Sequence, residues 1–304
     1  MHQEDGFFTA SDGTRIHYLD IGEGIPVIVP HGYGCNAELF REQFMTTSDR
    51  LRCISFDQRG YGQTPPDEAA SLALSARDMH DLIRHLELEE VMVVGYSMGA
   101  SVLFAYVRQF GCEYLKKVVI GDMSPKLLND ENWKLGLYQG WFTQDDLTKD
   151  TSFLTEEETR VRNYYFYDQL LFLHHADEER RCPDPVSAPL EYKKMKERID
   201  ALEDVSLYNE QETAANRYYM KSMGESDFRD VLPEITVPAL LVYASPGSIY
   251  NEETGRYIES KLPDASFLKI ENAGHCLTPE QNTIYWQEVI RFFREEAGKS
   301  DPTL

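Results

Sequence analysis

The sequence has few cysteines, little positive charge and no long apolar run. Its five cysteines, among 304 residues, are odd in number and show no CxxC spacing, so neither a disulfide framework nor a zinc site is predicted. Lysine and arginine number 30 against 52 aspartates and glutamates, which gives a net charge of −22. That balance argues against a nucleic-acid groove or an anionic membrane surface, because both need basic side chains to replace counterions.

Long apolar segments are absent from the whole sequence, the first residues included. No run of about eighteen uncharged apolar residues occurs, so no membrane span is predicted. The opening residues MHQEDGFFTA lack a basic stretch followed by an apolar one, and no signal peptide is predicted. We therefore expect a soluble, cytoplasmic protein that acts on a small neutral, cationic or apolar molecule, and whose oligomeric state the sequence leaves open.

The residues that are present predict an α/β core. Hydrophobic residues make up 42% of the chain, enough for a sizeable core. Runs such as VMVV and KVVI are continuous rather than alternating, which is typical of parallel strands covered by helices on both faces. Asp12 and Gly13 supply turn residues for a hairpin near the start. Together these patterns predict a mostly parallel, twisted sheet with helices on both faces.

After Pro125 the pattern becomes helical for about a hundred residues. Segments 155–175, 189–205 and 206–224 are each predicted to be helices, with no strand pattern between them. Strand patterns resume at 237–245 and 265–275, and a last helix is expected from Thr278 and Pro279. We predict a core of residues 1–122 and 232–304 and an inserted helical lid, or cap, of residues 123–231.

The most specific motif is Gly95-Tyr96-Ser97-Met98-Gly99, a G-x-S-x-G pattern between a predicted strand and a predicted helix. A serine at such a turn is held in a strained conformation that exposes its hydroxyl. A second loop, His31-Gly32-Tyr33-Gly34, also follows a strand. We expect the Tyr33 and Met98 N–H groups to form an oxyanion hole, in which one donor lowers a barrier by about 3 to 4 kcal/mol.

These motifs, the FDQRGYGQT segment and the AGH segment that ends at His275 resemble the α/β-hydrolase fold superfamily, specifically its lidded serine-hydrolase (esterase- or lipase-like) members. The resemblance covers nearly the whole chain. It implies that Ser97 is the nucleophile and His275 the base, and that Asp57 and Arg59 brace loops. No cofactor is predicted, and no metal is assigned to the remaining histidines.

One element of the pattern is missing. Most relatives carry the triad acid after the strand predicted at 239–244, and aligning on Val237-Pro238 puts Gly247 at that place. Residues 245–248 have no charge to supply and are interpreted as a pocket wall. The acid must therefore come from elsewhere, or be absent.

Three explanations compete for the missing acid. Asp122 follows the strand after the nucleophile helix, so it projects at the same sheet edge as Ser97, and haloalkane dehalogenase-like relatives take their acid from that position. Glu252 and Glu253 are alternative acids a few residues downstream. In the third explanation, the site has no functional acid. Asp122 is favoured.

The function expected is that of a serine hydrolase cleaving a carboxylic ester, thioester or lactone through an acyl-enzyme. Aromatic residues of the insertion, among them Trp133, Tyr138 and Trp141, are candidates for the pocket wall, although packing of the insertion onto the core also explains them. Two alternatives stay open: a carbon–carbon bond hydrolase or perhydrolase using the same triad, and a non-catalytic small-molecule binder. Dehalogenase and epoxide hydrolase chemistry is disfavoured, because those relatives have an aspartate where this chain has Ser97.

Overall fold

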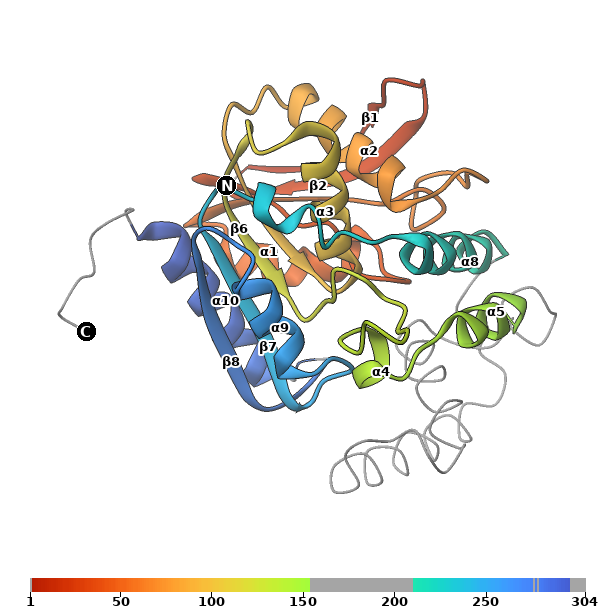
Figure 1. Ribbon diagram of the computed structural model, residues 1–304. Coiled ribbons are helices and arrows are strands. Elements are labelled where there is room, and N and C mark those ends of the chain that lie inside the picture. The colour runs from red at the N-terminus through yellow and green to blue at the C-terminus, as the bar shows by residue number, and fades with distance from the viewer. Residues whose placement is uncertain (1, 154–209, 276, 278, 296–304) are drawn as a thin grey trace.

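The protein is built on one twisted sheet of eight strands (Figure 1). The computed structural model describes residues 2–153, 210–275, 277 and 279–295. The strands are β1 (Gln3–Thr9), β2 (Arg15–Ile21), β3 (Ile25–Ile28), β4 (Leu51–Phe56), β5 (Val91–Tyr96), β6 (Leu115–Gly121), β7 (Ala239–Gly247) and β8 (Ala265–Gly274).

The sheet is antiparallel at one edge and parallel elsewhere. The strand order is β1-β2-β4-β3-β5-β6-β7-β8, and β1 pairs with β2, and β2 with β4, in antiparallel fashion. The remaining pairs are parallel. The predicted hairpin is confirmed, with Gly13 in a left-handed conformation at φ 89° in its turn. The mostly parallel sheet predicted from the sequence is therefore observed.

Helices cover both faces of the sheet, and the continuous apolar strands supply a core to each. In β7, Leu241 belongs to one apolar cluster while its neighbours Leu240 and Val242 belong to the other, because successive side chains of a strand point to opposite faces. The first cluster includes residues of α2 (Leu72–His85), α3 (Met98–Phe110) and α9 (Glu252–Glu259); the second includes residues of α1 (Arg41–Thr47) and α10 (Pro279–Arg294).

An insertion without strands, in its described part, separates β6 from β7. It contains α4 (Leu137–Gly140), α5 (Gln144–Phe153) and α8 (Glu210–Glu225), and a short 3-10 helix (Leu232–Glu234) follows before β7. The two ends of the insertion meet where Phe228 N–H donates to the Pro125 carbonyl at 2.8 Å. A second short 3-10 helix, Ala37–Phe40, lies outside the insertion and precedes α1. Figure 1 shows α5 and α8 side by side, away from α9 and α10, in agreement with the contacts between α5 and α8.

The helical character predicted for the insertion is observed where residues are described. The helix predicted at 206–224 appears as α8, whereas the helices predicted at 155–175 and 189–205 lie outside the described residues. The boundaries of a separate lid stay a prediction. In the parts of the chain that the structure describes, no helix has the length and apolar character to cross a bilayer.

Candidate active site

Three parallel strands end in the three residues predicted to act together. Ser97 directly follows β5, Asp122 follows β6 and His275 follows β8. Because β5, β6, β7 and β8 are consecutive neighbours in a parallel sheet, their carboxyl ends meet at one edge, where open α/β sheets bind ligands. Residues far apart in the chain thus come together through strand order.

These three side chains form a continuous hydrogen-bonded line. His275 Nε2 lies 3.0 Å from Ser97 Oγ, and His275 Nδ1 lies 2.6 Å from Asp122 Oδ2. The side chain of Asp122 is fully buried and that of His275 is 9% exposed. A carboxylate on Nδ1 fixes the tautomer in which Nε2 accepts a proton. The geometry therefore suits removal of the Ser97 hydroxyl proton by His275.

The turn that carries Ser97 is strained and tightly packed. Ser97 has φ 54° and ψ −133°, a region that non-glycine residues avoid. A Cβ added to Gly99 would lie 2.2 Å from the Pro30 carbonyl oxygen. Glycine is required there because α3 approaches the backbone that follows β3 too closely for any side chain.

The residues that carry the two predicted oxyanion donors lie near Ser97. Met98 is the first residue of α3, so its N–H has no acceptor within the helix. A Cβ added to Gly32 would lie 3.7 Å from Ser97 Cβ, which places the loop of Tyr33 beside the nucleophile. The Tyr33 hydroxyl donates to the Asn216 carbonyl of α8 at 3.1 Å, so the insertion holds this loop.

His31 shapes the same loop. It is fully buried, and burial lowers its pKa to about 4, so it is neutral near pH 7. Its Nε2 accepts from Gln58 N–H at 3.0 Å, and its Nδ1 then donates to the Gly32 carbonyl at 2.8 Å. These bonds fix the backbone that precedes Tyr33.

Asp57 and Arg59, predicted to brace loops, have such contacts. Asp57 accepts from His17 Nδ1 at 2.7 Å and from the backbone N–H groups of Ala37 and Gln63 at 2.7 and 2.8 Å. Arg59, 1% exposed, binds carboxylates from three segments. These are Asp12, Asp67 and Asp78.

The backbone at His275 is anchored by the residue that precedes the nucleophile. The Tyr96 hydroxyl donates to the His275 carbonyl at 2.7 Å, and the centroids of the two rings are 5.6 Å apart. A Cβ added to Gly121 would lie 2.3 Å from the Tyr96 ring. The variable position of the G-x-S-x-G motif therefore also holds the backbone of His275, the predicted base. Only the tertiary contact, 179 residues apart, reveals this role.

The alternative acids lie elsewhere. Glu252 begins α9 and binds Lys269 at 3.1 Å and Arg256 at 3.4 Å, and these bonds lower its pKa, with Lys269 the larger cause. Glu253 is solvent-exposed. Within the described structure, neither has a hydrogen bond or ion pair with His275.

Residues 245–248, predicted to form a loop after the strand, span the end of β7 and the first residue after it. Ser248 is only 3% exposed, and its hydroxyl lies 2.7 Å from each carboxylate oxygen of Asp122. Ser248 therefore packs against Asp122, and the interpretation of residues 245–248 as a pocket wall stays a prediction. No sequence signal pointed to this contact, which joins residues 126 apart.

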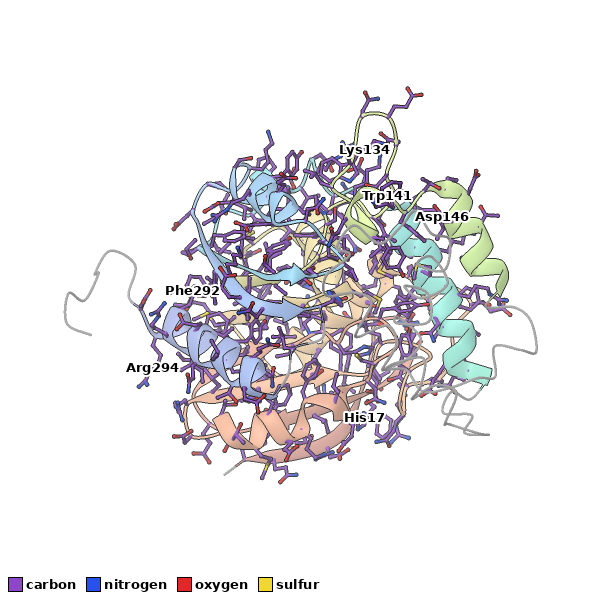
Figure 2. The ribbon with its side chains drawn as sticks, turned by 90° about the horizontal axis from the view of Figure 1, so that it is seen from below. His17, Lys134, Trp141, Asp146, Phe292 and Arg294 are labelled. Carbon is purple, nitrogen blue, oxygen red and sulfur yellow. The ribbon has the colours of Figure 1, made fainter. Side chains whose placement is uncertain are left out.

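The three aromatic candidates for the pocket have different surroundings. Trp133 packs against Tyr257 at a centroid distance of 5.0 Å, and its indole N–H donates to the Lys126 carbonyl at 3.0 Å. Tyr138 is buried, whereas Trp141, labelled in Figure 2, is 46% exposed. No contact of the three with Ser97 or His275 is described, so their place in a pocket stays a prediction.

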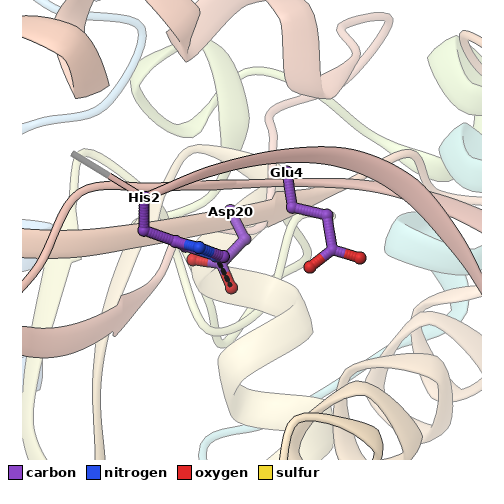
Figure 3. Close-up of side chains that lie close together, drawn as sticks. All are labelled: His2, Glu4 and Asp20. Atoms are coloured by element: carbon purple, nitrogen blue, oxygen red, sulfur yellow. Dashed lines mark ion pairs between the residues drawn. The ribbon is translucent and has the colours of Figure 1, made fainter.

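One group of side chains away from this edge has metal-ligand chemistry. His2, Glu4 and Asp20 offer ligand atoms within 4.8 Å of one another (Figure 3). However, Arg52 binds both oxygens of Asp20 through its Nε at 3.0 and 3.1 Å. A guanidinium on the buried carboxylate already balances its charge and repels a cation. We assign no metal to it.

Comparison with known proteins relates the whole arrangement to one fold. A family model described as alpha/beta hydrolase fold matches residues 25–280. A non-heme chloroperoxidase, CPO-A1, of Kitasatospora aureofaciens is 34% identical over 128 residues, 41% of this chain and 46% of that protein. An AB hydrolase superfamily protein of Bacillus subtilis is 24% identical over 84% of this chain and 87% of that protein.

Solved structures agree on the fold. An esterase (EaEST) from Exiguobacterium antarcticum superposes with a TM-score of 0.74 at 20% identity, covering 96% of this chain and all of that one. At that identity the likeness concerns the fold alone. The chain spans about half the length of the first curated relatives it matches, between 46 and 49% of each.

Proposed function

The chain belongs to the α/β-hydrolase fold family, and we propose that it is a serine hydrolase that cleaves a neutral or apolar ester-type substrate through an acyl-enzyme. The observation that carries the proposal is the hydrogen-bonded line from Ser97 through His275 to Asp122. A carboxylic ester, a thioester or a lactone has the required carbonyl carbon.

The proposed reaction has two halves. Ser97 Oγ attacks the carbonyl carbon while its proton moves to His275 Nε2. The protonated imidazole then gives that proton to the departing alcohol or thiol, and the acyl group stays on Ser97. Water, deprotonated by the same Nε2, attacks the acyl-enzyme, and Ser97 recovers its proton when the acid leaves. Asp122 stays ionised and stabilises the imidazolium.

The tetrahedral intermediates place negative charge on the former carbonyl oxygen. The N–H groups of Tyr33 and Met98 are the proposed donors. Removing one such donor typically slows turnover by about 10²- to 10³-fold. Backbone donors cannot be deleted by side-chain substitution, so the bonds of His31 that shape the loop offer the experimental access to this part of the site.

A second candidate is perhydrolysis, in which hydrogen peroxide instead of water attacks the acyl-enzyme and the acyl group is released as a peracid. The similarity to a protein named non-heme chloroperoxidase favours it. The same residues serve both reactions. Carbon–carbon bond hydrolysis and simple binding of a ligand are the remaining outcomes that a test must separate.

A fluorophosphonate probe tests the nucleophile directly. The wild-type protein is expected to be labelled rapidly, and Ser97→Ala to lose labelling and the hydrolysis of p-nitrophenyl esters. Ser101→Ala is a matched control, because Ser101 is a buried serine of the helix that follows the nucleophile, 2% exposed; it should label like wild type.

The outcomes separate the functions. Folded wild-type protein that neither labels nor hydrolyses any ester would favour the binder. Peracid formation with hydrogen peroxide and an acetate donor, lost in Ser97→Ala, would add perhydrolysis.

A further inference from the structure

We propose that Ser248 is a positioning residue of the site: its hydroxyl holds the carboxylate of Asp122 in the orientation that meets His275. The proposal rests on the serine-hydrolase function proposed above. It gives a role to the loop after β7, which carries no acid in this chain. Four neighbouring strands, β5 to β8, then each contribute one residue from their carboxyl ends.

The direction of the hydrogen bond follows from the partners of Ser248. Its oxygen accepts from the backbone N–H of Tyr250 at 2.9 Å, so that donor already faces it. An ionised carboxylate has no proton to offer. The single hydroxyl proton must therefore point at Asp122, whose two oxygens lie 2.7 Å away.

The two contacts on Asp122 constrain it from different sides. Oδ2 is shared by His275 Nδ1, at 2.6 Å, and the Ser248 hydroxyl, while Oδ1 is contacted by Ser248. The backbone of Asp122 has φ 42°, a left-handed conformation that few non-glycine residues adopt. With this backbone set by the end of β6, the hydroxyl limits rotation of the carboxylate plane.

The insertion holds Ser248 in place. Gln139 donates through its side-chain amide to the Ser248 carbonyl at 2.8 Å, and its own N–H donates to the Ile249 carbonyl at 2.9 Å. Gln139 has φ 52°, as does Tyr138 before it. The strained pair therefore positions Gln139 to bind two successive carbonyls of the loop. A path of hydrogen bonds runs from the insertion to the acid.

Losing the Ser248 hydroxyl is expected to affect turnover rather than binding. Ser248→Ala should lower kcat on p-nitrophenyl butyrate about tenfold, the size of effect that a lost hydrogen bond to a charged group produces. KM should stay within about twofold, because the residue acts through Asp122 rather than on the substrate. Ser248→Thr keeps the hydroxyl and should restore most of the rate.

A double-mutant cycle separates positioning from general packing. Ser248→Ala, Asp122→Asn and the double variant are compared by kcat and by the rate of fluorophosphonate labelling of Ser97. If Ser248 acts through the carboxylate, Ser248→Ala should lower both rates about tenfold when residue 122 is aspartate. When residue 122 is asparagine, the same substitution should lower them less than about twofold, because the effects of coupled residues are not additive. Ser245→Ala, at the end of β7, is the nearby control and should behave as wild type.

Equal losses in both backgrounds, or no loss beside Asp122, would overturn the proposal. If the alanine variant is unfolded, Ser248→Cys completes the same cycle, since a thiol fills the site but donates weakly. Failure of the proposed serine-hydrolase function gives a different result. In that case Ser97→Ala retains activity, or Asp122→Asn alone lowers kcat less than about tenfold. A cycle without coupling but with an inactive Ser97→Ala removes only the role of Ser248.

Discussion

Replacing Asp122 by asparagine is the sharpest perturbation of this site, because it removes one charge and changes almost no volume. The carboxylate is fully buried and lies 2.6 Å from His275 Nδ1. An amide at this position has one oxygen and one NH₂ group. Which of the two faces His275 decides the outcome.

One orientation of the amide disrupts the site. Ser248 Oγ lies 2.7 Å from both oxygen positions of residue 122, so its hydroxyl finds an acceptor in either orientation. With the NH₂ group on the side of His275, the amide donates to His275 Nδ1. Nε2 must then carry the proton and cannot accept one from Ser97. A serine triad with this tautomer loses about 10⁴ in turnover.

Steady-state hydrolysis of p-nitrophenyl butyrate measures the effect. Asp122→Asn should lower kcat by about 10⁴, while the unfolding transition shows that the fold persists. Glu252→Gln and Glu253→Gln are matched controls, since each removes a carboxylate of the same region that has no hydrogen bond with His275; both should keep full activity. A loss below about tenfold for Asp122→Asn, or a large loss for either glutamine variant, would refute the reasoning.

Two further predictions concern the residues that brace the site. Arg59→Met should lower the free energy of unfolding by about 3–5 kcal/mol, measured with urea, because it leaves the buried Asp78 carboxylate without its partner; a change below about 1 kcal/mol would contradict this. Burial alone lowers the pKa of His17, but hydrogen bonds to two carboxylates raise it above its ordinary value of 6.5. The stabilisation from the charged imidazole is therefore complete below about pH 6.5 and is lost as the pH rises through the raised pKa. Wild type should exceed His17→Gln in stability by more at pH 6 than at pH 9, and a pH-independent difference would argue against it.

Local rules explain why much of the core was predictable. A strand, a tight turn with small residues and a helix form one continuous segment around Ser97, and the constraint that exposes its hydroxyl lies within a few residues. The same holds for the hairpin at Asp12-Gly13, where Gly13 has φ 89°. Hydrophobic runs likewise predicted buried parallel strands, because burial on both faces leaves no room for alternation.

Contacts between distant segments were beyond such rules. The sequence favoured Asp122 among three explanations for the acid, because it follows a strand at the sheet edge that also carries Ser97, but it gave no distance between either carboxylate and His275. The order of β5, β6, β7 and β8 in the sheet brings Asp122 within 2.6 Å of the imidazole, while Glu252 pairs with cations of α9 and β8.

The sequence by itself determined the fold class and the residue types at the site, because strand, turn and helix preferences act over a few residues. Tertiary structure decided which carboxylate lies against His275 and which hydroxyl lies against that carboxylate. Ser248 has no recognisable motif, since its importance comes from a partner 126 residues away. The loop that lacks an acid supplies a hydrogen-bond donor, and only the pairing of neighbouring strands reveals it.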